Sequence, residues 1–179
     1  MKSLLSTLAV ATMAVSGLGL GLYALVYFTA QPESFPFVQQ REVYAARRLA
    51  LSVHIGGGAL AIALGALQFF TQLRRRAPGL HRMIGYVYVL SVAASAIASF
   101  GIVRTSFGGV SNTAAFSLLA MLWIFTTGMA LLRARQGRFA EHQVWMIRSY
   151  ALTFAALTLR AQLGLLIFVA DLELPQAYL

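Results

Sequence analysis

The chain contains no cysteine among its 179 residues. Disulfide bonds, thiolate metal sites, iron–sulfur clusters and cysteine nucleophiles are therefore all excluded. Acidic residues are also scarce, because 5 Asp and Glu stand against 14 Lys and Arg. No Asp or Glu lies inside a long apolar run, which weakens a carboxylate-driven cation transporter as a function.

Charged residues of both signs make up only 11% of the chain, and hydrophobic residues make up 59%. In an average soluble domain, about 25% of the residues are charged and about 45–50% are hydrophobic. Several apolar runs reach the roughly 20 residues that a helix needs to cross a membrane. Lipid-exposed sheet would leave backbone groups unpaired. The sequence therefore predicts an all-α transmembrane helical bundle, with residues 1–179 forming a single membrane domain.

Five apolar runs are predicted to span the membrane. They cover approximately residues 4–29, 49–70, 83–103, 112–132 and 142–169. The first run is longer than the apolar region of a signal peptide, so we expect it to stay attached as a helix. Pro32 and Pro36 break the polar connection after it. The basic turn around Pro78-Gly79 separates the second and third spans.

The basic residues lie in the connections between the spans. One set of connections carries Lys2, Arg74, Arg75, Arg76, Arg82, Arg133, Arg135 and Arg138, with only Glu141 against them. The positive-inside rule then predicts a cytoplasmic N-terminus and an extracytoplasmic C-terminus, which we expect in a bacterial inner membrane. The same bias explains the net charge of +9. We expect membrane lipids as partners and no nucleic acid.

Polar and small residues recur at three- and four-residue spacing, so they share one face of each helix. The faces are His54, Gly58, Ala61, Gly65, Gln68 and Gln72 in the second span, His81, Gly85, Tyr88, Ser95 and Ser99 in the third, and His142, Ser149, Thr153, Ala156 and Arg160 in the fifth. Small residues let helices approach closely in lipid. These faces are predicted to point into the bundle.

Arg160 is the intramembrane charge that most needs an explanation. It lies about 27 Å along the fifth span from His142, and an unsatisfied charge at that depth is costly. Its partner is either structural, such as Gln68 or backbone carbonyls, or a bound ligand. Arg148 lies on another face near the cytoplasmic end, where its side chain can reach lipid headgroups.

His81 and His142 each open a predicted helix at the cytoplasmic face. Two interpretations compete. The two imidazoles would ligate one b-type haem iron, with Arg82 and Arg148 available for its propionates. Alternatively, these residues contact lipid phosphates or cap the helix ends. His54 lies in the other leaflet with no second histidine, and a lone histidine there is usually a hydrogen-bonded interior residue.

Three stretches resemble the bacterial membrane protein family called domain of unknown function 2306. They are His54-Ile55 with Gly65-Ala66-Leu67-Gln68-Phe69, Leu80-His81-Arg82 with Gly85-Tyr86-Val87-Tyr88, and His142 with Trp145-Met146-Ile147-Arg148 through Thr158-Leu159-Arg160. The resemblance covers the second to fifth spans. It implies a multi-pass membrane protein and assigns no catalytic residue.

The leading hypothesis is a polar interior site that binds haem b or a quinone-like ligand. Its candidate residues are His81, His142, Arg82 and Arg148 for a cofactor, and His54, Gln68 and Arg160 for another ligand. The alternative is a non-catalytic accessory subunit or a lipid- or anion-binding bundle, acting with partner subunits or as a homo-oligomer. The residues leave open whether the protein is an enzyme.

Overall fold

The structure is a computed structural model that describes residues 2–24, 28, 41–105 and 109–170, apart from the side chains of some helical residues. Its elements are α1 (Lys2–Ala24), α3 (Arg41–Ala46), α4 (Arg48–Leu67), α5 (Thr71–Arg76), α6 (Pro78–Phe100), the 3₁₀ turn η3 (Val103–Thr105), α7 (Gly109–Arg135) and α8 (Phe139–Ala170). No strand occurs in these described segments. The predicted all-α class is confirmed.

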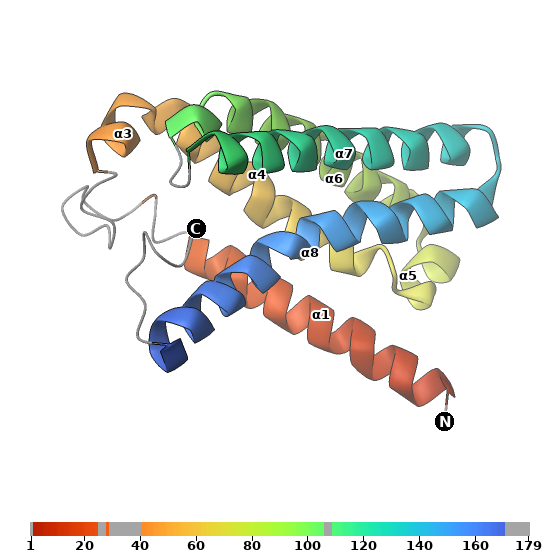
Figure 1. Cartoon of the computed structure of the whole chain (residues 1–179). Helices are drawn as coiled ribbons and strands as arrows, with labels where there is room; N and C mark the ends of the chain where they lie inside the picture. Colours follow the sequence, from red (N-terminus) through yellow and green to blue (C-terminus); the bar gives the residue numbers. More distant parts are fainter. Residues whose placement is uncertain (1, 25–27, 29–40, 106–108, 171–179) are drawn as a thin grey trace.

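The long helices follow one another up and down the bundle (Figure 1). The most extensive packing joins α4 to α6 and α7 to α8, while α1 lies along α4. The start of α1, the short helix α5 and the turn between α7 and α8 lie at one end of the molecule in Figure 1. Helices α6 and α8 both begin at this end, so they run in the same direction.

Three of the described helices, α4, α6 and α7, are long and apolar enough to cross a membrane. A shorter apolar helical stretch is Ala11–Tyr23. Large apolar side chains such as Leu60, Leu90 and Phe125 are exposed on the outside of the bundle, where lipid would be their solvent. The count of five spans and the sides on which the termini lie stay predictions.

The connections contain more helix than the sequence suggested. Helix α3 occupies part of the region between the first two spans. The basic turn is also largely helical, because α5 ends at Arg76 and Pro78 is already in the first turn of α6. Proline is favourable there, since the first helical N–H has no partner to lose. Helices α6 and α8 begin before the predicted starts at residues 83 and 142.

The core lies where α4, α6 and α8 meet, around two fully buried tyrosines. Tyr88 is 0% exposed and Tyr150 is 1% exposed. A Cβ atom added at Gly65 would lie 2.5 Å from ring carbons of Tyr150 and 2.8 Å from Tyr88, so only glycine fits between α4 and these rings. Close packing of small residues against large ones substitutes for the hydrophobic effect in lipid.

Most of the predicted inward faces are confirmed. The buried residues include Ala61, Gly65 and Gln68 of α4, Tyr88 and Ser95 of α6, and Ser149 and Thr153 of α8. Gln72 is exposed, so its placement on the inward face was wrong. The reason is that α4 ends at Leu67 and the chain turns before α5 begins at Thr71.

Candidate functional site

A set of polar side chains ties α6, α7 and α8 together in the middle of the bundle. The Tyr88 hydroxyl lies 2.7 Å from Ser149 Oγ and 2.9 Å from Thr153 Oγ1. Ser149 Oγ lies 2.7 Å from Thr127 Oγ1. Trp123 Nε1 donates to Thr153 Oγ1 at 2.9 Å, and Thr127 Oγ1 donates to the Trp123 carbonyl at 2.7 Å. The contacts therefore form a ring that begins and ends on Trp123.

The contacts fix the direction of most of the hydroxyl protons in this ring. An indole N–H can only donate and a carbonyl can only accept. The Thr127 proton must go to the Trp123 carbonyl, so Ser149 donates to Thr127 and Tyr88 donates to Ser149. Thr153 Oγ1 has one proton and two acceptors within reach, the Tyr88 oxygen at 2.9 Å and the Ser149 carbonyl at 3.0 Å. Because its members find partners among the described residues, we interpret the ring as a structural tie.

His81 and His142 lie at equal depth on the two parallel helices. Each precedes a residue of the 2.7 Å Tyr88–Ser149 contact by seven positions, because 88 − 7 = 81 and 149 − 7 = 142. Seven residues are about two helical turns and about 10 Å, and they return to nearly the same face. Both histidines therefore lie below the polar ring, toward the end of the bundle where α6 and α8 begin.

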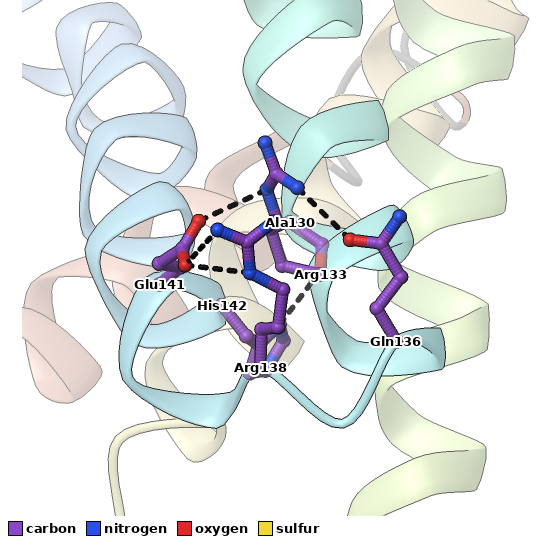
Figure 2. Close-up of polar contacts among 6 residues, drawn as sticks. All are labelled: Ala130, Arg133, Gln136, Arg138, Glu141 and His142. Carbon is purple, nitrogen blue, oxygen red and sulfur yellow. Dashed lines mark hydrogen bonds and ion pairs between the residues drawn. The ribbon is translucent and has the colours of Figure 1, made fainter.

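The ring of His142 is oriented by helix α7. Its Nδ1 lies 2.9 Å from the carbonyl oxygen of Ala130 (Figure 2). A carbonyl can only accept, so Nδ1 carries the proton and donates it. The lone pair of the neutral imidazole is then on Nε2, which is the arrangement found in most metal-bound histidines.

The ring of His81 differs from that of His142 in its contacts. Its Nδ1 is buried and has no hydrogen-bond partner in the part of the chain that the structure describes. His142 and Arg74 lie close enough to act electrostatically on the His81 ring. Gln68 Nε2 makes only a long contact of 3.5 Å with the His81 backbone carbonyl. The two histidines thus lie at the same end of the bundle, and His81 has unsatisfied polar capacity among the described residues.

His54 takes part in a different set of hydrogen bonds, which join α4 to α6. Its Nδ1 donates to the Ser95 carbonyl at 3.0 Å, and Ser95 Oγ donates to the His54 carbonyl at 2.8 Å. The close approach is possible because a Cβ atom at Gly57 would lie 2.8 Å from the Ser91 carbonyl oxygen. The structure does not bring His54 together with the other two histidines.

Charged side chains gather at the turn between α7 and α8, beside His142 (Figure 2). Glu141 Oε2 lies 3.2 Å from Arg133 Nε, and Glu141 Oε1 accepts a hydrogen bond from Arg138 Nε at 2.7 Å. Arg133 also donates to Gln136 Oε1 at 2.9 Å. The Arg133–Glu141 contact is an ion pair without hydrogen-bond alignment, since Arg133 Nε has no hydrogen-bond partner among the described residues.

The chain matches one family of known proteins. The model of the family described as predicted membrane protein, domain of unknown function 2306, matches residues 51–179. The chain belongs to this family. No curated protein and no solved structure matches it. The matched residues contain His81, His142 and the polar ring, so these features lie within the family region.

The other candidate residues of this family member lie apart from one another. Arg82 is exposed beside His81, and the Arg148 guanidinium lies 4.5 Å above the centre of the Trp145 ring. Gln68 is 8% exposed, with its Oε1 3.3 Å from the place that a Cβ of Gly85 would take. Arg160 belongs to α8, but its side chain lies outside the described residues.

Sequence reasoning missed the contribution of α7 to the interior. Trp123 and Thr127 complete the polar ring, and Ala130 orients His142. These residues are three or four positions apart, as is Ala120 before them. The same spacing argument that identified the faces of the other helices would have found this face. Across the described residues, no three His, Asp or Glu side chains lie together as a metal-binding group.

Proposed function

We propose that this protein binds one b-type haem between the starts of α6 and α8, with His81 and His142 as the two axial ligands. The observation that carries the proposal is the placement of the two histidines on parallel helices. Each lies seven positions before the Tyr88–Ser149 contact. Two imidazoles at one depth on parallel helices are what bis-histidine ligation of haem would use.

The chemistry of the two rings supports the proposal. His142 presents its Nε2 lone pair because Nδ1 donates to Ala130. His81 has a buried nitrogen without a partner among the described residues. Arg82 is exposed next to His81, and Arg74 is near the ring. Guanidinium groups bind carboxylates strongly, so these two arginines are better placed than Arg148 to hold the propionates.

The packing of the bundle limits where the proposed haem would lie. Gly65 is in contact distance of the rings of Tyr88 and Tyr150, so the middle of the bundle is filled by side chains. A haem would therefore be held on the side of the polar ring where α6 and α8 begin. Because the basic connections gather at this end, we also propose that it faces the cytoplasm of a bacterial cell whose inner membrane holds the protein.

The test is the absorption spectrum of the protein purified in mild detergent from haem-sufficient cells. We expect a Soret band and visible bands that sharpen on reduction. His81→Ala and His142→Ala should each abolish this spectrum. His54→Ala is the matched control, since His54 is bonded to Ser95 away from the site, and it should keep the bands.

A colourless wild-type protein would refute the haem proposal. The second candidate function, a bundle that binds anionic lipid, would then be favoured. It is supported by the exposed arginines at the same end, which are Arg74, Arg75, Arg76, Arg82, Arg135 and Arg138. Copurification of phospholipid with the colourless protein, and its loss on exchange of these arginines, would be its signature.

A further inference from the structure

The turn between α7 and α8 is a short connection of fixed geometry. Gly137 adopts a positive φ of 73°, which few other residues tolerate. The Arg138 amide donates to the Arg133 carbonyl at 2.9 Å, and the Gly137 amide donates to the Ala134 carbonyl at 3.1 Å. In this pattern a glycine in the left-handed backbone conformation ends the helix, and the amides of the turn donate hydrogen bonds to the last carbonyls of the helix. Helix α8 begins immediately afterwards, at Phe139.

Glu141 joins the two sides of this turn. Its carboxylate contacts Arg133 from the last turn of α7 and Arg138 from the connection (Figure 2). The Arg133 side chain is only 21% exposed, so its charge is partly removed from water and an unpaired state would be costly. Glu141 is the only acidic residue between positions 43 and 170. No other carboxylate in that stretch can replace it.

The ion pair between Glu141 and Arg133 lies next to the hydrogen bond between His142 and Ala130. Arg133 follows Ala130 by three positions, so both residues lie on one face of α7. Glu141 and His142 are adjacent in the first turn of α8. The Arg133–Glu141 ion pair and the His142–Ala130 hydrogen bond therefore join the same two helical turns. Both contacts hold the first turn of α8 against the last turns of α7.

We propose that Glu141 is a positioning residue that fixes the tautomer and orientation of His142. With Glu141 in place, the first turn of α8 stays against α7 and Nδ1 donates to Ala130. Without it, Arg133 and Arg138 repel each other across the turn, the first turn of α8 frays, and the imidazole is free to exchange its proton between nitrogens. The consequence for haem affinity rests on the proposed function, whereas the tautomer of His142 does not.

The experiment uses full-length protein labelled with ¹⁵N-histidine, in which the three histidines are assigned with His142→Ala. In wild type we expect a single His142 form protonated on Nδ1. Glu141→Gln should convert this signal into a mixture of both neutral forms. Glu141→Asp keeps the charge and should retain most of the wild-type form. Gln136→Ala removes one hydrogen bond to Arg133 but no ion pair, and it should leave His142 unchanged.

In haem-loaded protein, loss of an outer-shell partner typically weakens binding about 10–100-fold. Because Glu141 acts through His142, we expect about a 10-fold weaker retention of haem in Glu141→Gln. If Glu141→Gln does not fold, Arg133→Gln breaks the same ion pair and leaves Glu141 paired with Arg138, and it should shift the His142 signal in the same direction.

The outcomes separate this proposal from the preceding one. A colourless wild-type protein whose His142 signal responds to Glu141→Gln would remove the haem and keep the role of Glu141. A haem protein whose His142 nitrogen signals are identical in wild type, Glu141→Gln and Arg133→Gln would overturn the role of Glu141 and keep the haem.

Discussion

Replacing Gly65 with alanine tests the packing on which the whole interior depends. The added Cβ would lie 2.5 Å from Cδ2 and Cε2 of Tyr150 and 2.8 Å from Cε2 of Tyr88. Contacts this short must be relieved by movement of the rings or by separation of the helices. Neither ring is free to move. The Tyr150 hydroxyl donates to the Ile62 carbonyl at 2.9 Å, and the Tyr88 hydroxyl belongs to the polar ring.

The free-energy cost of Gly65→Ala has two contributions. Overpacking a filled core costs about 1–3 kcal/mol. Losing one of the tyrosine hydrogen bonds costs about 1 kcal/mol more. The sum is about 2–4 kcal/mol, which for a chain of this length corresponds to a lowering of the melting temperature by about 5–15 °C.

The assay is thermal unfolding in detergent, followed by circular dichroism at the helix signal. Gly128→Ala is the matched control, because Gly128 is also in a long helix but nothing lies within 4 Å of its added Cβ. Alanine is about 0.5–1 kcal/mol better than glycine within a helix, so the control should be neutral or slightly stabilised. Equal melting temperatures for the two variants would show that α4 is not packed against the tyrosines as described.

Two further predictions concern the polar ring and the topology. Tyr88→Phe removes the hydroxyl that connects Thr153 with Ser149, and we expect it to lower the free energy of unfolding by about 1 kcal/mol; a variant as stable as wild type would show that the ring contributes nothing. A reporter fused after Thr71 should lie in the cytoplasm, and one fused after Leu179 should lie outside. A C-terminus on the same side of the membrane as the N-terminus would exclude an odd number of spans.

The faces of the individual helices could be predicted from the sequence because they depend on local spacing. The small residues Ala61 and Gly65 and the polar residues Ser95 and Ser149 all point inward as expected. In an apolar chain the lipid-facing and interior residues differ little in hydrophobicity. Small and polar side chains are then the signal that distinguishes the interior, because close approach and hydrogen bonding hold helices together in lipid.

The partners of these residues could not be predicted, because pairing depends on how helices far apart in sequence pack. His54 bonds to Ser95, 41 positions away, and Tyr88 bonds to Ser149, 61 positions away. The equal depth of His81 and His142 was predicted from their places at the starts of two spans. Their relation to the Tyr88–Ser149 contact required knowing that side chains of α6 and α8 meet, and the contribution of Trp123 required the packing of α7.

The direction of the hydroxyl chain bears on which functions the interior can perform. A chain of hydroxyl groups can pass protons only if each end exchanges protons with a titratable group or with water. The ring starts at the Trp123 indole, which only donates, and its hydroxyl groups end on the carbonyls of Trp123 and Ser149, which only accept. Among the described residues, these ends do not exchange protons. We therefore interpret this ring as a support that holds α6 and α8 together at the level of Tyr88. His81 and His142 lie two turns away from that level, so the same spacing sets the distance between the turns that carry them. Changes in the ring are thus expected to act on the histidine site through geometry, and changes in the histidines should leave the ring intact.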